Sequence, residues 1–262
     1  MRHLSIIGIG AGNPDHITVQ AIRALSRIDV VFMLDKGQEK DALAALRRDI
    51  CERYITNKSH RVVEIEDPER DRNPKNYQSA VVEWHAKRAA LYEQRLREKL
   101  ADGEHGAILV WGDPSLYDST LRIIEQVTAM RTIEFDYEVI PGITSVQALA
   151  ARHRIALNRI GGSVHITTGR KLANGLPTGQ DDVVVMLDGD CAFKHVKDND
   201  VDIYWGAYVG TDDEMLIAGN LQERMAEIER ARGEARERHG WIMDTYLLRK
   251  NAAGSQDRGG NQ

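Results

Sequence analysis

Three strand-to-helix junctions, each marked by a proline, constrain the fold of this chain more than any other feature of its sequence. Each junction runs from a short apolar segment through a turn into residues with helical spacing. The apolar segments are residues 4–9, 107–111 and 137–140, and the prolines that follow them are Pro14, Pro114 and Pro141. Short apolar runs of this kind are typical of buried strands, and proline suits the start of a helix, where its missing N–H has no partner. The sequence therefore predicts an α/β fold with parallel strands.

The first junction shows the pattern most fully. Apolar residues recur every three or four positions over 17–28, Asn13 is a good N-cap, and Pro14 suits the first helical position. A second apolar run, residues 29–34, ends at Asp35. We therefore expect a strand, a helix that begins at Asn13-Pro14, and a parallel strand joined by a right-handed crossover.

The second half of the chain has a different texture. Strand-like runs occur at residues 163–168, 183–187, 202–209, 215–218 and 241–248, with one long helical stretch at about 221–238. Fewer helices per strand indicate a mixed sheet. We expect an N-terminal α/β domain over 1–141 with a mostly parallel sheet and flanking helices, a C-terminal mixed α/β domain over 142–250, and a disordered, Gly-rich tail over 251–262.

Composition excludes several classes of protein. Of the 262 residues, 42% are hydrophobic and 29% are charged, which is ordinary for a globular protein. The net charge of −5 gives no overall positive field to collect nucleic acid or anionic lipid. Cys51 and Cys191 have no zinc-ligand spacing, and the apolar runs are too short to cross a bilayer. We expect a cytoplasmic protein that binds no metal, nucleic acid or membrane.

The glycines of the first turn are also compatible with a dinucleotide site. Gly8, Gly10 and Gly12 follow a strand, and Asp35 ends the next strand, where a ribose-binding acid belongs. The pattern lacks its last glycine or alanine, and Pro14 removes a donor where pyrophosphate would seek backbone N–H groups. An NAD(P)-dependent oxidoreductase stays open as an alternative, and so do plain turn glycines.

Together the three turns resemble those of the tetrapyrrole methylases. The matching segments are GIGAGNPDHITVQAIRAL, WGDPSLYDS and VIPGITSVQALA, in the order and spacing of that family. The resemblance implies a two-domain methylase-like fold, a homodimer, a tetrapyrrole substrate, and S-adenosylmethionine as cofactor with S-adenosylhomocysteine as product. The chain is most similar to members that methylate C1 of precorrin-5 and release acetate. Methylation at another precorrin position is the alternative within corrin synthesis, and a diphthine or ribosomal-RNA methylase is a weaker one.

The resemblance also implies which residues contact the cofactor. Carried over by position, they are Pro14, Trp111, Gly112, Asp113, Leu116, Thr144, Ser145, Met186 and Gly210. A carboxylate such as Asp113 can accept from ribose hydroxyls or from the cofactor's ammonium group. Asp113 followed by Pro114 also forms a plain N-cap pair. Trp111 and Ser115 replace the family's usual glycine and aromatic residue. These differences change the expected pocket wall, so they affect the substrate assignment and not the cofactor assignment.

Acetate release asks for more than methyl transfer, because water must add to an acetyl carbonyl and a base should assist. Candidates near the predicted sheet edge are Asp35, Tyr117 and Asp118. The sequence does not choose among them, and a strand-end cap or an exposed helix position explains each as well. Candidate cations for the substrate's carboxylates are Lys36, Arg170 and Lys171, for which ordinary surface charge is the alternative.

Overall fold

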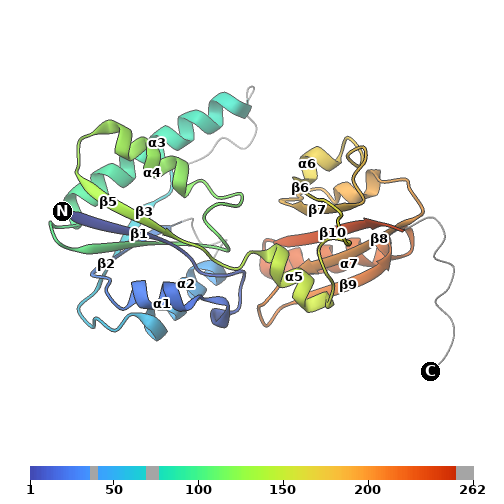
Figure 1. Cartoon of the computed structure of the whole chain (residues 1–262), viewed down its shortest axis with the longest axis horizontal. Coiled ribbons are helices and arrows are strands. Elements are labelled where there is room, and N and C mark those ends of the chain that lie inside the picture. Colours follow the sequence, from blue (N-terminus) through green and yellow to red (C-terminus); the bar gives the residue numbers. More distant parts are fainter. Residues whose placement is uncertain (36–40, 69–76, 252–262) are drawn as a thin grey trace. The chain divides into compact units, whose positions relative to one another are not determined.

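The computed structural model describes residues 1–35, 41–68 and 77–251. The chain divides into two compact units, Met1–Thr144 and Ser145–Gln262, called unit 1 and unit 2 below. Each unit is built around its own five-stranded sheet (Figure 1). The predictions for Lys36 and for the tail beyond Asn251 lie outside the described residues.

Unit 1 contains a parallel sheet with helices on both faces. Across the sheet its strands are β3 (Arg61–Glu66), β2 (Val30–Asp35), β4 (His105–Val110), β1 (Arg2–Gly8) and β5 (Phe135–Ile140). Its helices are α1 (Val19–Leu25), α2 (Asp41–Tyr54), α3 (Tyr77–Lys99) and α4 (Thr120–Met130). Every pairing between neighbouring strands is parallel, as the sequence predicts.

Alternating side chains of β1 divide the core of unit 1 into two layers. Leu4 and Ile6 pack with buried residues of α3 and α4, whereas Ile7 and Ile9 pack with those of α1 and α2. The two pairs of helices accordingly lie on opposite faces of the sheet (Figure 1). Burying each such side chain contributes about 1.5–3 kcal/mol, so a strand that is apolar on both faces is held in the interior of the sheet, between β4 and β5.

The first helix does not begin where the sequence predicts. Asn13 caps only a short 3-10 helix, Pro14–His16, in which its Oδ1 accepts a hydrogen bond from Asp15 N at 2.8 Å. Helix α1 begins at Val19, and the Thr18 hydroxyl accepts from Ala21 N at 3.1 Å. The prediction of one helix from Asn13 was wrong, because the sequence holds two capping residues and the chain is extended between them.

Unit 2 contains a mixed sheet. Across it the strands are β6 (Val164–Thr168), β7 (Asp182–Met186), β10 (Asp244–Lys250), β8 (Val201–Ala207) and β9 (Met215–Asn220). Its helices are α5 (Ser145–His153), α6 (Gly169–Leu172) and α7 (Leu221–His239). Strands β6 and β7 pair in parallel and the other pairs are antiparallel, which confirms the predicted mixed sheet.

Candidate functional site

The structure brings the three proline-bearing turns of unit 1 together. They follow β1, β4 and β5, and β1 pairs with both of the others, so all three turns lie at one edge of the sheet. Gly10 and Gly112 form an antiparallel bridge in which Gly112 N donates to Gly10 O at 2.8 Å. Asp113 Oδ2 accepts from Gly142 N at 2.8 Å and ties the second turn to the third. These contacts place Gly112 and Asp113 of the second turn against the first and third turns.

Close backbone contact explains two glycines of these turns. A Cβ on Gly142 would lie 2.1 Å from the carbonyl oxygen of Gly112, and one on Gly8 would lie 2.6 Å from Gly142 N. Gly112 differs, because its φ of +68° requires glycine while a Cβ there would meet only Thr144 Cα, at 3.7 Å. The first two glycines therefore serve the packing of the turns, and Gly112 leaves room beside its backbone.

Asp113 is held firmly within its loop. Its carboxylate accepts from Ser115 N at 2.8 Å, from the Ser115 hydroxyl and from Gly142 N. Partial burial raises the pKa of this carboxyl, but the hydrogen bonds from Ser115 and Gly142 outweigh that effect and lower the pKa below its usual value. Asp113 is thus an ionised acceptor at neutral pH, and each of its oxygens has capacity for another donor.

The first turn does not have the geometry of a dinucleotide site. In that motif the glycines lead directly into a helix, whose N-terminus binds the pyrophosphate. Here they lead into the 3-10 helix Pro14–His16, and α1 begins after Thr18. A Cβ on Gly10 would also lie 2.5 Å from His16 Cβ, so the returning chain fills the space beside the glycine. The geometry therefore disfavours the oxidoreductase alternative.

The candidate residues of unit 2 lie at one edge of its sheet. Strands β7 and β8 are both antiparallel to β10, so they run in the same direction as each other and as β6. The carboxyl ends of these three strands therefore lie at the same edge of the sheet. Arg170 and Lys171 follow β6, Met186 is the last residue of β7, and Gly210 follows β8. The Ser145 hydroxyl shares a 2.9 Å hydrogen bond with that of Thr245, which pairs with Met186.

The turns at this edge of unit 2 have unusual backbone conformations. Leu187 and Tyr208 have φ values of +53° and +49°, a region that costs free energy for residues other than glycine. Leu187 follows Met186 and its apolar side chain is 63% exposed. Gly210 N donates to Glu214 Oε2 at 2.8 Å, so this N–H already has a partner within the turn. Sequence reasoning missed Leu187, because nothing local predicts a left-handed leucine.

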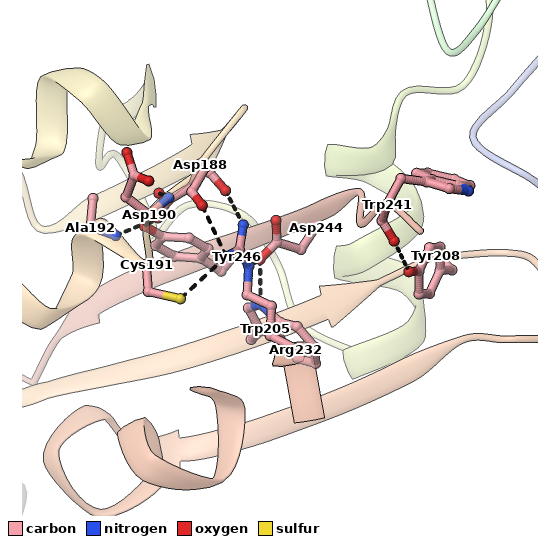
Figure 2. Close-up of polar contacts among 11 residues, drawn as sticks. Asp188, Asp190, Cys191, Ala192, Trp205, Tyr208, Arg232, Trp241, Asp244 and Tyr246 are labelled. Carbon is pink, nitrogen blue, oxygen red and sulfur yellow. Dashed lines mark hydrogen bonds and ion pairs between the residues drawn. The ribbon is translucent and has the colours of Figure 1, made fainter. Parts of the chain in front are cut away.

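A buried polar cluster supports the turn after β7 (Figure 2). Arg232 of α7 donates from Nε to Asp244 Oδ2 at 3.0 Å, from Nη1 to Gly189 O at 3.1 Å, and from Nη2 to Asp188 O. Trp205 Nε1 donates to the same Asp244 oxygen at 2.9 Å. The side chains of Arg232, Asp244, Asp188 and Trp205 are all buried. Gly189 takes part only through its backbone carbonyl. The guanidinium therefore joins α7 and β10 to the backbone of the turn.

The Asp188 carboxylate holds the same turn from within. It accepts from the Tyr246 hydroxyl at 2.6 Å, from Ala192 N at 2.7 Å and from Asp190 N at 3.0 Å. Burial and the neighbouring carboxylate of Asp188 raise the pKa of Tyr246, so its hydroxyl stays a donor. Burial alone would lower the pKa of Arg232, but Asp244 outweighs it and raises that pKa. The cluster thus fixes the backbone that carries Leu187.

The three candidates for acid–base catalysis have different surroundings. Asp118 precedes α4, accepts from Thr120 N at 2.6 Å, and lines a cavity of unit 1 together with Arg47, Arg88 and other residues. Tyr117 is 43% exposed with φ of +52°, and partial burial raises its pKa. Asp35 ends β2.

Neither metal ligands nor a membrane helix is evident in the part of the chain that the structure describes. No three histidine, cysteine, aspartate or glutamate side chains there are grouped so that they could hold a metal ion. No helix there combines the length and the apolar character needed to cross a membrane. Cys51 and Cys191 are free and buried, and burial raises the pKa of the Cys51 thiol to about 12.

Known proteins match both the sequence and the fold. Residues 3–224 match the sequence profile of the Tetrapyrrole (Corrin/Porphyrin) Methylases. The chain belongs to the tetrapyrrole methylase family. It is 53% identical over 252 residues to a Sinorhizobium protein named precorrin-6A synthase [deacetylating], and the match covers 96% of this chain and 97% of that one.

Solved structures of methylases share the architecture. A cobalamin-synthesis-related protein from Corynebacterium diphtheriae superposes with a TM-score of 0.83 at 41% identity, covering 95% of this chain and 99% of that chain. A uroporphyrin-III C-methyltransferase from Thermus thermophilus, solved with S-adenosylhomocysteine, gives 0.55 at 14% identity, covering 94% and 91%. The second likeness concerns the fold alone.

Proposed function

We propose that this chain is an S-adenosylmethionine-dependent C-methyltransferase of corrin synthesis, which methylates C1 of precorrin-5 and releases acetate to give precorrin-6A. The observation that carries the proposal is the 53% identity to a precorrin-6A synthase [deacetylating] along nearly the whole of both chains. The substrate and the reaction are taken from that relative and from the resemblance of the three turns.

The residues at the two sheet edges fit the proposed cofactor. In unit 1, Gly112 leaves space beside its backbone, Asp113 offers carboxylate acceptors, and the buried Trp111 Nε1 has no hydrogen-bond partner among the described residues. In unit 2, Met186 and the exposed Leu187 offer apolar surface suited to an adenine ring. The remaining assignments, listed by chain position, are Pro14, Leu116, Thr144, Ser145 and Gly210.

The chain itself has little covalent chemistry to perform in methyl transfer. When bound, S-adenosylmethionine supplies an electrophilic methyl group. The protein's contribution is to hold the accepting carbon at near-attack distance and in line, which accounts for most of the acceleration in reactions of this kind. The clamped Asp113 loop and the supported Leu187 turn are suited to that task, because their hydrogen bonds fix the backbone before any ligand binds.

A thermal-shift comparison tests the cofactor assignment. S-adenosylhomocysteine is expected to stabilise the protein, whereas NAD and NADP at the same concentration are not. A ligand that binds only the folded state stabilises it by about 2.7 kcal/mol at a hundredfold excess over its Kd. Stabilisation by a nicotinamide nucleotide without any by S-adenosylhomocysteine would refute the proposal.

Replacing Asp113 is expected to weaken cofactor binding. Hydrogen bonds to a charged group contribute about 1.5–3 kcal/mol, so Asp113→Ala should raise the Kd for S-adenosylhomocysteine by about tenfold or more in a calorimetric titration. The exposed strand residue Asp136 supplies the control, because Asp136→Ala removes a carboxylate from the same unit. An unchanged Kd in Asp113→Ala would remove this residue from the site.

The assembly is an inference from the family resemblance, and the compartment is one from the cysteines and the short apolar runs of the sequence. We expect a homodimer in the cytoplasm, acting on a tetrapyrrole. Light scattering on the purified protein checks the first of these, and a mass of one chain at micromolar concentration would contradict it.

A further inference from the structure

A small cavity in unit 1 lies where two neighbouring strands separate. Pairing between β2 and β4 ends at Phe32 and Ile108, whereas β4 stays paired with β1 as far as Val110. The helices that follow β2 and β4 lie on opposite faces of the sheet (Figure 1). In parallel α/β sheets ligands bind at such a point, outside the carboxyl ends of the strands. The cavity volume is about 30 Å³, enough for about two water molecules.

The guanidinium of Arg47 lines the cavity. Arg47 of α2 donates from Nε to Leu109 O at 3.2 Å, beyond the last β2–β4 pair. Among the described residues, no carboxylate forms an ion pair with it. Arg88 of α3 differs, because it donates to both oxygens of Asp67, bonds the Ser119 hydroxyl at 3.2 Å and stacks on Trp84. Arg47 therefore keeps its planar fork of donors for a ligand.

A carboxylate and a phenol complete the polar lining. Asp118 and Tyr92 line the same cavity as Arg47, and Asp118 Oδ1 accepts a hydrogen bond from the backbone N–H of Thr120. Burial lowers the pKa of Arg47, and the nearby Tyr92 and Asp118 partly offset this. Burial raises the pKa of Tyr92 to about 12, so its hydroxyl remains a donor at neutral pH. An acceptor and two donors of different kinds thus face one small space.

Apart from Arg88 and Thr120, the rest of the lining is apolar. It consists of side chains from β2, β4 and α4, namely Phe32, Leu34, Ile108, Val110 and Ile123. Such a wall suits a methyl group better than a charged ligand. The base, the hydrogen-bond donors and the apolar wall suit an acetyl group, and a cavity with room for about two water molecules can take its carbonyl oxygen together with the attacking water.

We propose that this cavity is the deacetylation site, in which Asp118 is the general base and Arg47 binds the acetyl oxygen. The inference rests on the proposed function and names residues for the step that releases acetate. Asp118 takes a proton from water as the water oxygen bonds to the acetyl carbon, and the carbonyl oxygen becomes an oxyanion held by Arg47 and Tyr92. The bond between C1 and the acetyl carbon then breaks, which releases acetic acid that ionises to acetate and leaves its electron pair on C1, where the pair would form the new bond to the methyl group.

The charges of the cavity suit both ends of this step. Arg47 and Arg88 are balanced by Asp118 and by Asp67, which neutralises Arg88 from outside the cavity. The balanced cavity can admit a neutral acetyl group and water. Once Asp118 carries the proton, the positive charge of Arg47 is no longer balanced within the cavity. The carboxylate of the product can then balance it. This argument predicts that removing the Asp118 charge strengthens the binding of acetate while it removes the base.

Acetate binding tests the assignment without the cofactor. Sodium acetate is expected to raise the melting temperature of Asp118→Asn above its value in sodium chloride of equal concentration at pH 7, and to raise that of the wild type less. Arg47→Gln should weaken acetate binding at least tenfold, Arg47→Lys should weaken it less, and Asp118→Asn should strengthen it. The exposed neighbour Arg48 gives the control, because Arg48→Gln should bind acetate as the wild type does. No effect of acetate on Asp118→Asn would overturn the proposal.

The rate of acetate release from precorrin-5 tests directly whether Asp118 is the base. A general base contributes about 10²–10⁴-fold, so Asp118→Asn should release acetate at least a hundredfold more slowly, with its Kd for S-adenosylhomocysteine unchanged within twofold. Asparagine keeps an oxygen for Thr120 N, which preserves the helix start. Wild-type rates in Asp118→Asn would overturn this inference alone. Failure of the wild type to release acetate would instead contradict the proposed function.

Discussion

Replacing Arg232 by methionine is expected to destabilise unit 2 by about 3–5 kcal/mol, since a buried charge is left without its partner. The guanidinium is buried and donates to Asp244, Asp188 O and Gly189 O. Methionine fills similar volume but satisfies none of these acceptors. Urea denaturation followed by circular dichroism measures the loss, and amide hydrogen exchange assigns it to unit 2.

An exposed arginine on the same helix provides the control. Arg224 pairs with Glu227 one turn away at 3.0 Å, and both side chains are more than 40% exposed. Arg224→Met should change the free energy of unfolding by less than about 1 kcal/mol. Combining Arg232→Met with Asp244→Asn should recover part of the loss, because the unpaired charge is removed. Equal effects of Arg232→Met and Arg224→Met would contradict a structural role for the cluster.

Gly142→Ala should destabilise unit 1 by about 3 kcal/mol. Adding a carbon to a well-packed region costs about 1–3 kcal/mol, and the very short contacts here place this substitution at the upper end of that range. The new methyl carbon would start 2.1 Å from the carbonyl oxygen of Gly112 and 2.7 Å from Gly8 C, which are backbone atoms that cannot rotate away. The three turns would have to separate, so Gly142→Ala should also weaken binding of S-adenosylhomocysteine. Urea denaturation and calorimetric titration measure the two effects.

Gly233 supplies a control of opposite sign. It lies within α7, and a Cβ there would meet nothing within 4 Å. Alanine is favoured over glycine by about 0.8–1.0 kcal/mol in a helix interior, so Gly233→Ala should stabilise the protein. If Gly142→Ala proved as harmless as Gly233→Ala, the close approach of the three turns would be contradicted.

Local signals in the sequence predict the scaffold well. Short apolar runs, turn glycines and prolines are properties of neighbouring residues, and they predict the parallel sheet of unit 1 and the mixed sheet of unit 2. They fail where two local signals compete, as Asn13 and Thr18 do for the start of α1. They fail again for α6, whose four residues are too few to show a helical period.

The candidate site depends on contacts that no local signal carries. Asp118 could be named from the sequence as one candidate among three. Its cavity neighbours Arg47 and Tyr92 come from α2 and α3, and only the order of strands across the sheet brings them together. The exposed, left-handed Leu187 similarly depends on Arg232, which is distant in sequence and holds the turn after β7.

The central claim is that this chain both methylates a corrin precursor and removes its acetyl group. The most direct measurement is product analysis after incubation with precorrin-5 and S-adenosylmethionine carrying a ¹³C-labelled methyl group. We predict one labelled methyl on C1 by NMR, the mass of precorrin-6A, and one acetate released for each methyl transferred. A labelled methyl on another carbon, or methylation without acetate, would contradict the account.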